Sequence, residues 1–260
     1  MEVGGTLNAL SIPQDKLKAL LDNPGRQVMG QIAGQTYCAR IGIPDYRKKV
    51  AAHYEPLLGV SLDAICEQAA IPLEFDHFGL IVEFETPIEL QMFDGDFVMD
   101  EGPRDLIAKF GGVIVRNVCL NADRVDNEHR AKFRHLNFHY DRGDHQERQY
   151  SLYTRDSRDP LHQPPRESST LFIANIVAQL QAMKENGESK VTQPGVRPSY
   201  SIFEKEPVID LIDDIILEHP WNEPQGIGEI SMLNNRTALH ASFYRTPSRV
   251  SYQIGVRYLH

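Results

Sequence analysis

The sequence predicts a mostly β protein with flanking helices, in which the second half of the chain forms an antiparallel barrel. The first observation behind this prediction is a series of short segments, rich in β-branched and aromatic residues, that turn or helix signals separate. The second is a composition of 41% hydrophobic and 24% charged residues over 260 positions, which is typical of a globular chain with a buried core. The strand candidates are Leu136–Tyr140, Gln149–Tyr153, Thr170–Ala174, Gly228–Met232, Ala238–Phe243 and Arg249–Tyr258.

The first half of the chain is expected to supply supporting elements. Apolar residues at helical spacing indicate short helices, and a Gly-Gly pair ends the last of them. Two β-branched runs are typical of buried strands. The helices are expected at Pro13–Leu21, Ser61–Ala70 and Pro103–Phe110, and the strands at Gly79–Glu85 and Val113–Val118.

Two further helices are expected outside the barrel, at Ile176–Glu185 and Pro207–Leu217, where apolar residues recur at helical spacing. Between the strands, Asp156–Ser169 has the polar, proline-bearing composition of a long loop. The chain contains no internal repeat or low-complexity linker. We therefore expect one domain, with residues 1–100 as supporting helices and strands and residues 101–260 as the core.

Charge and cysteine content exclude several classes of protein. The balance of 27 Lys and Arg against 36 Asp and Glu gives a net charge of -9, which disfavours a general binder of nucleic acid or anionic membranes. No apolar stretch approaches the roughly 18 to 20 residues that cross a bilayer, and the N-terminus lacks a signal-peptide pattern. Three widely spaced cysteines, Cys38, Cys66 and Cys119, indicate neither a disulfide framework nor a thiolate zinc site. A cytoplasmic location and a small-molecule partner are expected.

One short motif, His139-Tyr140-Asp141, has the spacing of a metal-ligand pair. Residues at i and i+2 on a strand point to the same face, so both side chains can bind one ion. A non-haem iron(II) centre needs two His and one carboxylate on one face of an octahedron, with the opposite positions open. His240, on another strand candidate, is the best third ligand. From spacing alone, a strand-end His followed by a turn Asp is the favoured interpretation.

The other histidines are weaker candidates as metal ligands. His53-Tyr54-Glu55 is an H-x-E, but it lies in a stretch of helical character without partner signals. For the remaining histidines, a solvated or hydrogen-bonded side chain is the ordinary explanation. These are His77, His129, His135, His145, His162 and His219.

Three motifs around the H-x-D resemble the taurine dioxygenase and clavaminate synthase-like family of iron(II)/2-oxoglutarate oxygenases. The segment Glu167–Met183 is similar to the strand and helix that follow the H-x-D in that family. Asn235-Arg236 before His240 resembles the family pattern at the distal ligand. Arg249 lies after His240, where the family places the arginine that holds 2-oxoglutarate.

The resemblance implies a fold, a site and a reaction. The fold is a double-stranded β-helix, or cupin-like jelly roll. His139, Asp141 and His240 would bind Fe(II). Arg249 would pair with the far carboxylate of 2-oxoglutarate, Thr170 would assist there, and Ser251 is assigned to the same cosubstrate site. The implied activity is a dioxygenase that uses O2 to oxidise an unactivated C–H bond while 2-oxoglutarate becomes succinate and CO2.

The substrate is less constrained than the cofactors. Gln253 replaces the second arginine of taurine dioxygenase, which disfavours a sulfonate. Arginines between Arg134 and Arg166 indicate either a pocket for an anionic amino acid or sugar acid, or a solvated loop whose charges pair with nearby carboxylates. A catalytically silent metal or ligand-binding jelly roll remains the main alternative, and a zinc hydrolase with the same ligands is a weaker one. A homo-oligomer is possible.

Overall fold

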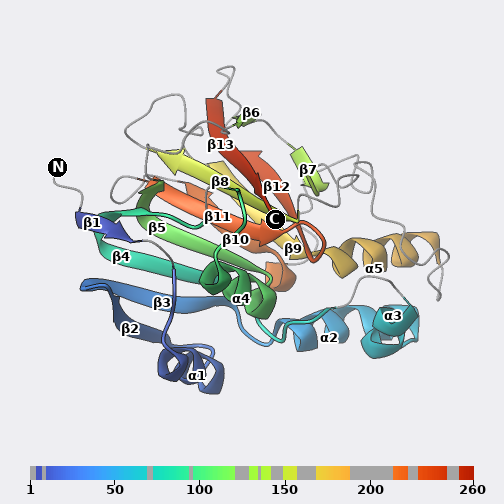
Figure 1. Cartoon of the computed structure of the whole chain (residues 1–260). Helices are drawn as coiled ribbons and strands as arrows, with labels where there is room; N and C mark the ends of the chain where they lie inside the picture. The colour runs from blue at the N-terminus through green and yellow to red at the C-terminus, as the bar shows by residue number, and fades with distance from the viewer. Residues whose placement is uncertain are drawn as a thin grey trace.

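The protein is described by a computed structural model (Figure 1). The described residues are 4–7, 10–68, 73–93, 96–120, 129–133, 136–141, 149–156, 168–187, 213–221, 228–244 and 252–260. Strands predominate and helices flank them, so the predicted mostly β class is confirmed. No helix in this described part is long and apolar enough to cross a membrane.

The larger of two sheets has nine strands. Its order is β2-β3-β4-β5-β11-β8-β13-β6, with β1 paired to β4. The pairs β1–β4 and β4–β5 are parallel and the others are antiparallel. The strands are β1 (Gly4–Leu7), β2 (Gln27–Ile32), β3 (Gln35–Ile43), β4 (Phe78–Leu90), β5 (Gly112–Leu120), β6 (His129–Phe133), β8 (Tyr150–Asp156), β11 (Gly228–Asn234) and β13 (Tyr252–Leu259).

The smaller sheet is antiparallel throughout and has the order β10-β9-β12-β7. Its strands are β7 (Leu136–His139), β9 (Ser168–Ala174), β10 (Leu217–Trp221) and β12 (Ala238–Tyr244). The strands from β6 to β13 are therefore divided between the sheets, with β6, β8, β11 and β13 in the larger and β7, β9, β10 and β12 in the smaller. This arrangement brings strands from the two ends of the C-terminal region into one sheet.

The helices lie outside the two sheets. They are α1 (Gln14–Asp22), α2 (Tyr46–Leu58), α3 (Leu62–Gln68), α4 (Glu101–Phe110) and α5 (Asn175–Asn186). Figure 1 shows α2, α3 and α5 gathered on one side of the sheets and α1 beside β2. The predictions for α1, α4 and α5 are confirmed to within two residues at each end, and that for α3 is confirmed over its described part. Helix α2 supplies the helical character expected around His53.

The helix predicted at Pro207–Leu217 is wrong over its described part. Residues 207–212 lie outside the described residues, Asp213–Ile215 is a single 3-10 turn, and Leu217 begins strand β10. Ile215 and Leu217 are nevertheless both buried, so the apolar pattern marked buried residues without specifying a helix. The Leu217 side chain fills the space that a β-carbon at position 79 would need. Gly79 also has a φ of +75°, a conformation that favours glycine.

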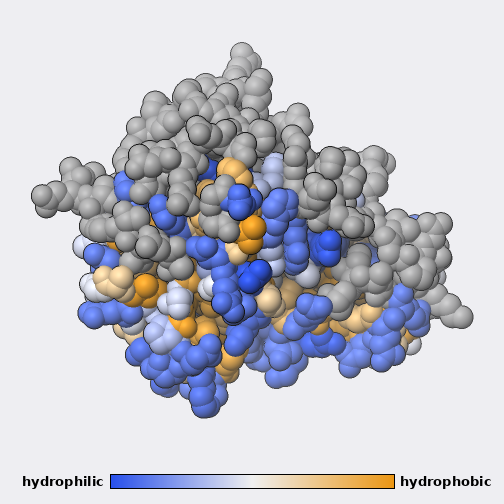
Figure 2. Space-filling view, viewed as in Figure 1, coloured by the Kyte–Doolittle hydropathy of each residue, from blue (hydrophilic) through white to orange (hydrophobic). Residues whose placement is uncertain are grey.

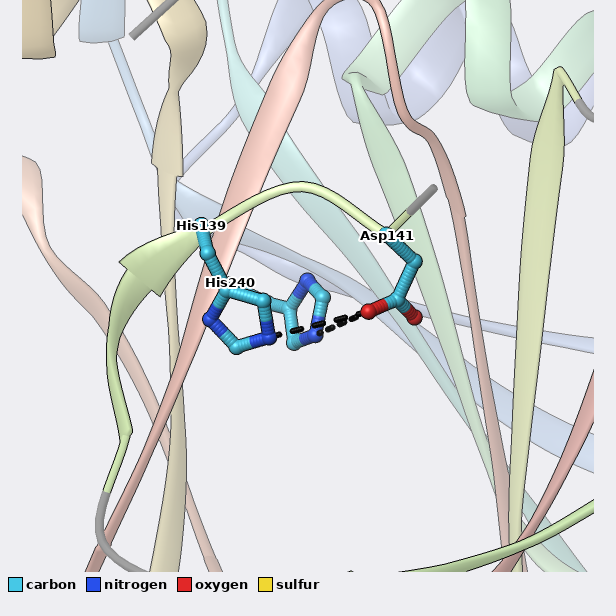
Figure 3. Close-up of side chains that lie close together, drawn as sticks. All are labelled: His139, Asp141 and His240. Atoms are coloured by element: carbon cyan, nitrogen blue, oxygen red, sulfur yellow. Dashed lines mark ion pairs between the residues drawn. The ribbon is translucent and has the colours of Figure 1, made fainter. Parts of the chain in front are cut away.

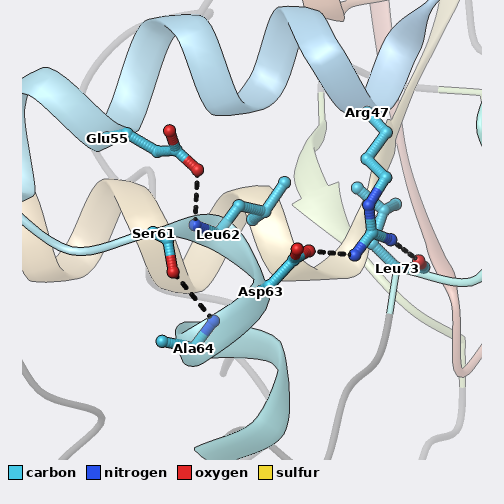
Figure 4. Close-up of polar contacts among 7 residues, drawn as sticks. All are labelled: Arg47, Glu55, Ser61, Leu62, Asp63, Ala64 and Leu73. Carbon is cyan, nitrogen blue, oxygen red and sulfur yellow. Dashed lines mark hydrogen bonds and ion pairs between the residues drawn. The ribbon is translucent and has the colours of Figure 1, made fainter.

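Polar contacts fix the junction between α2 and α3 (Figure 4). The Glu55 carboxylate on α2 accepts the backbone N–H of Leu62 at 2.7 Å and so satisfies a donor at the start of α3. Arg47, near the start of α2, contacts the Asp63 carboxylate at 2.5 Å and donates to the Leu73 carbonyl. The helices are therefore joined by specific contacts as well as by apolar packing.

Two apolar cores stabilise this architecture. One joins the smaller sheet and one face of the larger sheet to helices α2, α3 and α5, and it includes Phe138, Phe172 and Leu239. The other joins α1 and α4 to the larger sheet. Hydrophilic residues cover the lower edge of the molecule in Figure 2. Among the described residues, the exposed large hydrophobic side chains are Leu21, Met29, Leu57 and Val98.

Candidate metal centre

Three potential metal ligands meet between the two sheets (Figure 3). His139 ends β7, Asp141 follows in a bend, and His240 lies on β12. The Asp141 Oδ1 atom lies 3.6 Å from His139 Nε2 and 3.9 Å from His240 Nε2. One ligand atom from each residue lies within 4.8 Å of the other two. The structure thus brings the three predicted residues together.

Strand pairing explains why these residues meet. His240 and His139 are direct partners in the antiparallel β12–β7 register, so their side chains leave the same face of the smaller sheet. Their ring centroids are 4.2 Å apart. Because β7 ends at His139, the following bend turns the Asp141 carboxylate toward both imidazoles, as Figure 3 shows. Residues far apart in sequence therefore form one compact group.

Burial prepares the imidazole of His240 for metal binding. Both histidines are buried, whereas Asp141 is partly exposed. Burial, together with the neighbouring His139, lowers the pKa of His240 to about 3, although the Asp141 charge opposes this effect. At neutral pH His240 is therefore uncharged and has a nitrogen lone pair to offer.

The donor set fits a divalent transition metal. Metal–nitrogen bonds of about 2.1 Å place neighbouring ligand atoms about 3 Å apart, so small side-chain movements would close the present separations. Two imidazoles and one carboxylate are the ligands of facial iron(II) sites with open positions. Among the described residues no other group of three His, Cys, Asp or Glu could hold a metal ion, and Cys38 and Cys66 are free thiols.

The competing H-x-E motif has a structural role. His53, Tyr54 and Glu55 lie on α2, where residues two apart point in different directions. The Tyr54 hydroxyl donates to Gln181 Oε1 at 3.1 Å, and Glu55 holds the start of α3. Tyr54 and Glu55 are thus engaged in contacts within the fold.

The predicted cosubstrate residues are only partly within the described structure. Thr170 is buried on β9. Its partner on β12 is Ser242, two residues from His240, so Thr170 lies on the same face of the smaller sheet as the candidate ligands. Arg249 and Ser251 lie outside the described residues. The cosubstrate roles of all three stay predictions.

A tyrosine that the sequence did not single out contacts the candidate centre from the larger sheet. Tyr153 on β8 is buried, and its hydroxyl donates to Asp141 Oδ2 at 2.5 Å and lies 3.1 Å from His240 Nε2. Desolvation raises the pKa of Tyr153 well above its ordinary value, and the Asp141 charge adds to this effect. The phenol therefore remains protonated at neutral pH.

A second polar cluster between the sheets was also unexpected. The Glu229 carboxylate on β11 forms an ion pair with Arg155 on β8, at 2.7 Å, and a hydrogen bond with His219 on β10, at 2.6 Å. All three side chains are buried, and the Arg155 guanidinium lies 5.6 Å from the centre of the Trp221 ring. The solvated-loop interpretation is therefore wrong for Arg155. His219 is hydrogen-bonded, as the ordinary explanation expects.

The charges of this second cluster support one another. Burial alone would raise the pKa of Glu229, but His219 and Arg155 outweigh it and hold that pKa below its ordinary value. Desolvation lowers the pKa of Arg155, although the Glu229 charge opposes the effect. An arginine keeps its proton even when buried. We call these three residues the ionic cluster.

Comparison with known proteins gives solved structures of limited similarity and no match to a protein family. No family model matches the chain, and no curated protein does. Similar solved structures include PvcB, an Fe, alpha-ketoglutarate dependent oxygenase from an isonitrile synthetic pathway. It is 12% identical, with a TM-score of 0.42 over 70% of this chain and 86% of PvcB.

Two further solved structures are similar to this chain to about the same degree. One is a taurine dioxygenase from Burkholderia xenovorans, with 12% identity and a TM-score of 0.41 over 70% of this chain and 87% of that one. The other is AAD-2 in complex with Mn(II) and N-oxalylglycine, with 12% identity and a TM-score of 0.42 over 73% and 96% of the two chains.

Proposed function

We propose that the protein is an Fe(II)/2-oxoglutarate-dependent dioxygenase that oxidises an unactivated C–H bond of a small polar molecule, such as an amino acid or sugar acid. The observation that carries this proposal is the convergence of His139, Asp141 and His240 on one point between the sheets. Two imidazole nitrogens and one carboxylate oxygen use three positions of an octahedron and leave three for cosubstrates.

The strand order supports the jelly-roll core that this function expects. In the larger sheet β6, β13, β8 and β11 are neighbours, and in the smaller sheet β7, β12, β9 and β10 are neighbours. Antiparallel strands that cross repeatedly between two packed sheets are typical of a jelly roll. We infer that residues 101–260 form this core as one domain with the supporting elements of residues 1–100.

The residues of the chain have separable roles in this proposal. His139, Asp141 and His240 would hold Fe(II), which supplies the activation of O2 that drives oxidation of the substrate and decarboxylation of 2-oxoglutarate. Arg249 would bind the far carboxylate of 2-oxoglutarate through a two-pronged contact. Thr170, on the inner face of the smaller sheet, and Ser251 would donate hydroxyl hydrogen bonds to the same carboxylate.

The decisive experiment is the addition of Fe(II) and 2-oxoglutarate to the metal-free protein without oxygen. We expect a weak visible absorption band that neither component gives alone, and succinate once air is admitted with a substrate. A metal-binding protein that shows neither would be a silent binding module, and the oxygenase proposal would be abandoned. Succinate release over a panel of amino acids, sugar acids and phosphonates would then identify the substrate class.

A substitution tests the assignment of the cosubstrate arginine. Arg249→Ala should raise the 2-oxoglutarate concentration for half-maximal succinate release by at least about tenfold, because a charge-assisted contact is lost, and should leave Fe(II) affinity unchanged. Arg245→Ala, four positions earlier, is the matched control and should change neither. Equal losses of iron and 2-oxoglutarate binding would show that Arg249 acts elsewhere.

A further inference from the structure

The two oxygens of the Asp141 carboxylate have different surroundings. Oδ1 faces the imidazoles, at 3.6 Å and 3.9 Å from the Nε2 atoms of His139 and His240. Oδ2 accepts the hydroxyl of Tyr153, which reaches it from β8 in the opposite sheet. The phenol therefore distinguishes one carboxylate oxygen from the other.

The supports of Asp141 and Tyr153 also differ. Asp141 follows the end of β7, and its backbone belongs to a bend rather than to a strand. Tyr153 lies in the middle of β8, whose backbone pairs with β11 on one side and β13 on the other. The Tyr153 side chain is buried in the apolar core. The Tyr153 phenol, which the sheet holds in place, therefore contacts the carboxylate of Asp141, whose backbone lies outside any strand.

We propose that Tyr153 is a positioning residue of the metal centre, whose hydroxyl holds Asp141 Oδ2 so that Oδ1 alone is presented to the metal. The hydroxyl has one proton and lies close to both Oδ2 and His240 Nε2. A cation bound at that nitrogen leaves Asp141 as the acceptor. This inference rests on the metal centre of the proposed function and adds a residue to it.

The consequence concerns the open positions of the metal. Three protein ligands leave three positions of an octahedron, which a two-pronged 2-oxoglutarate and one O2 would fill. A carboxylate that rotates to bind through both oxygens would occupy one of these positions. Because the Tyr153 hydroxyl engages Oδ2, it opposes that rotation and keeps the site open.

The test is a Co(II) titration of the metal-free full-length chain, with a competing chelator and the visible spectrum as readouts. Tyr153→Phe keeps the ring and removes only the hydroxyl. We expect a 10- to 100-fold weaker affinity for Co(II), as is typical when a hydrogen-bond partner of a ligand is lost, and an altered visible spectrum. Thermal unfolding of the metal-free variant would show that it is folded.

The chain offers a matched control on the same strand. Tyr150 is also buried on β8, but it belongs to the core on the other side of the larger sheet. Tyr150→Phe should leave Co(II) affinity and spectrum unchanged. If Tyr153→Phe binds Co(II) like the unsubstituted protein, with the same spectrum, the positioning role is wrong while the metal centre stands. If the unsubstituted protein binds Co(II) no more tightly than Asp141→Ala does, the metal centre is wrong. The positioning role of Tyr153 is then wrong as well.

Discussion

Two polar clusters lie between the same pair of sheets, and they are built from similar residues in different proportions. The ionic cluster surrounds one carboxylate with two partners, since Glu229 meets Arg155 and His219 at 2.7 Å and 2.6 Å. The candidate metal centre has two imidazoles facing one carboxylate oxygen at 3.6 Å and 3.9 Å. The side chains of the ionic cluster are close enough to bind one another. Those of the metal centre are farther apart and surround a position that a metal ion could occupy.

The two clusters differ in how the charge of their carboxylate is compensated. A buried carboxylate needs compensating charge, and Arg155 supplies it for Glu229 within the protein. At the metal centre the lowered pKa of His240 removes a positive charge that would otherwise face Asp141. A divalent cation would supply that missing charge. The ionic cluster is therefore expected to stabilise the fold, and the other group to bind a ligand.

The largest expected effect is loss of metal binding on removal of a ligand. Asp141→Ala should weaken Co(II) affinity more than about 100-fold, beyond the usual cost of losing a ligand's hydrogen-bond partner, and should abolish succinate formation. The metal-free variant should unfold at nearly the same temperature as the unsubstituted protein. A chelator titration and a melting curve measure the two quantities. Retained binding would place the metal elsewhere.

The converse substitution should affect stability and not binding. Glu229→Gln leaves Arg155 buried beside a neutral amide and should lower the free energy of unfolding by about 3–5 kcal/mol. Urea unfolding measures this loss, and Co(II) affinity of the folded variant should stay within about threefold of the original. Glu67→Gln, at an exposed position on α3, is the control. An unchanged unfolding free energy would contradict a stabilising role for the ionic cluster.

The sequence was informative about the metal centre because local rules determine much of it. His139 and Asp141 are two residues apart at a strand end, a spacing with a geometric consequence that needs no tertiary structure. His240 was found through its motif context, since spacing alone left a strand-end His and turn Asp as an open interpretation. The strands β7, β8, β9, β11 and β12 were predicted within a few residues because their alternation and turns are local signals.

The ionic cluster could not be found in the same way. Arg155 and Glu229 are Cα partners in the β8–β11 register, and nothing near either residue specifies that pairing. Arg155 is two residues after Tyr153 and therefore points to the same inward face. The predicted strand ended at Tyr153, whereas β8 continues to Asp156, so the sequence did not indicate that Arg155 points inward. The helix expected at Pro207–Leu217 failed for a related reason, because pairing of β10 with β9 decides the conformation of Leu217.

Acidification should weaken the ionic cluster. The pKa of Glu229 is held below its ordinary value in the folded state. As pH falls below about 4.3, the unfolded chain gains the proton first, so this contribution is present at higher pH and is lost as pH falls through the folded pKa. Its slope reaches at most about 1.4 kcal/mol per pH unit. Urea unfolding from pH 7 to pH 3 should show a difference between the unsubstituted protein and Glu229→Gln that shrinks at low pH, and a constant difference would contradict this account.

The smallest expected effect separates charge from geometry within the ionic cluster. Arg155→Lys keeps the positive charge for Glu229 but loses the planar guanidinium that lies 5.6 Å from the centre of the Trp221 ring. We expect a loss of about 1–2 kcal/mol in the free energy of unfolding, of the order of a desolvated cation–π contact. Urea unfolding beside Glu229→Gln measures the comparison directly. A loss as large as that of Glu229→Gln would show that the guanidinium geometry, rather than the balance of charge, holds the two sheets together at this point.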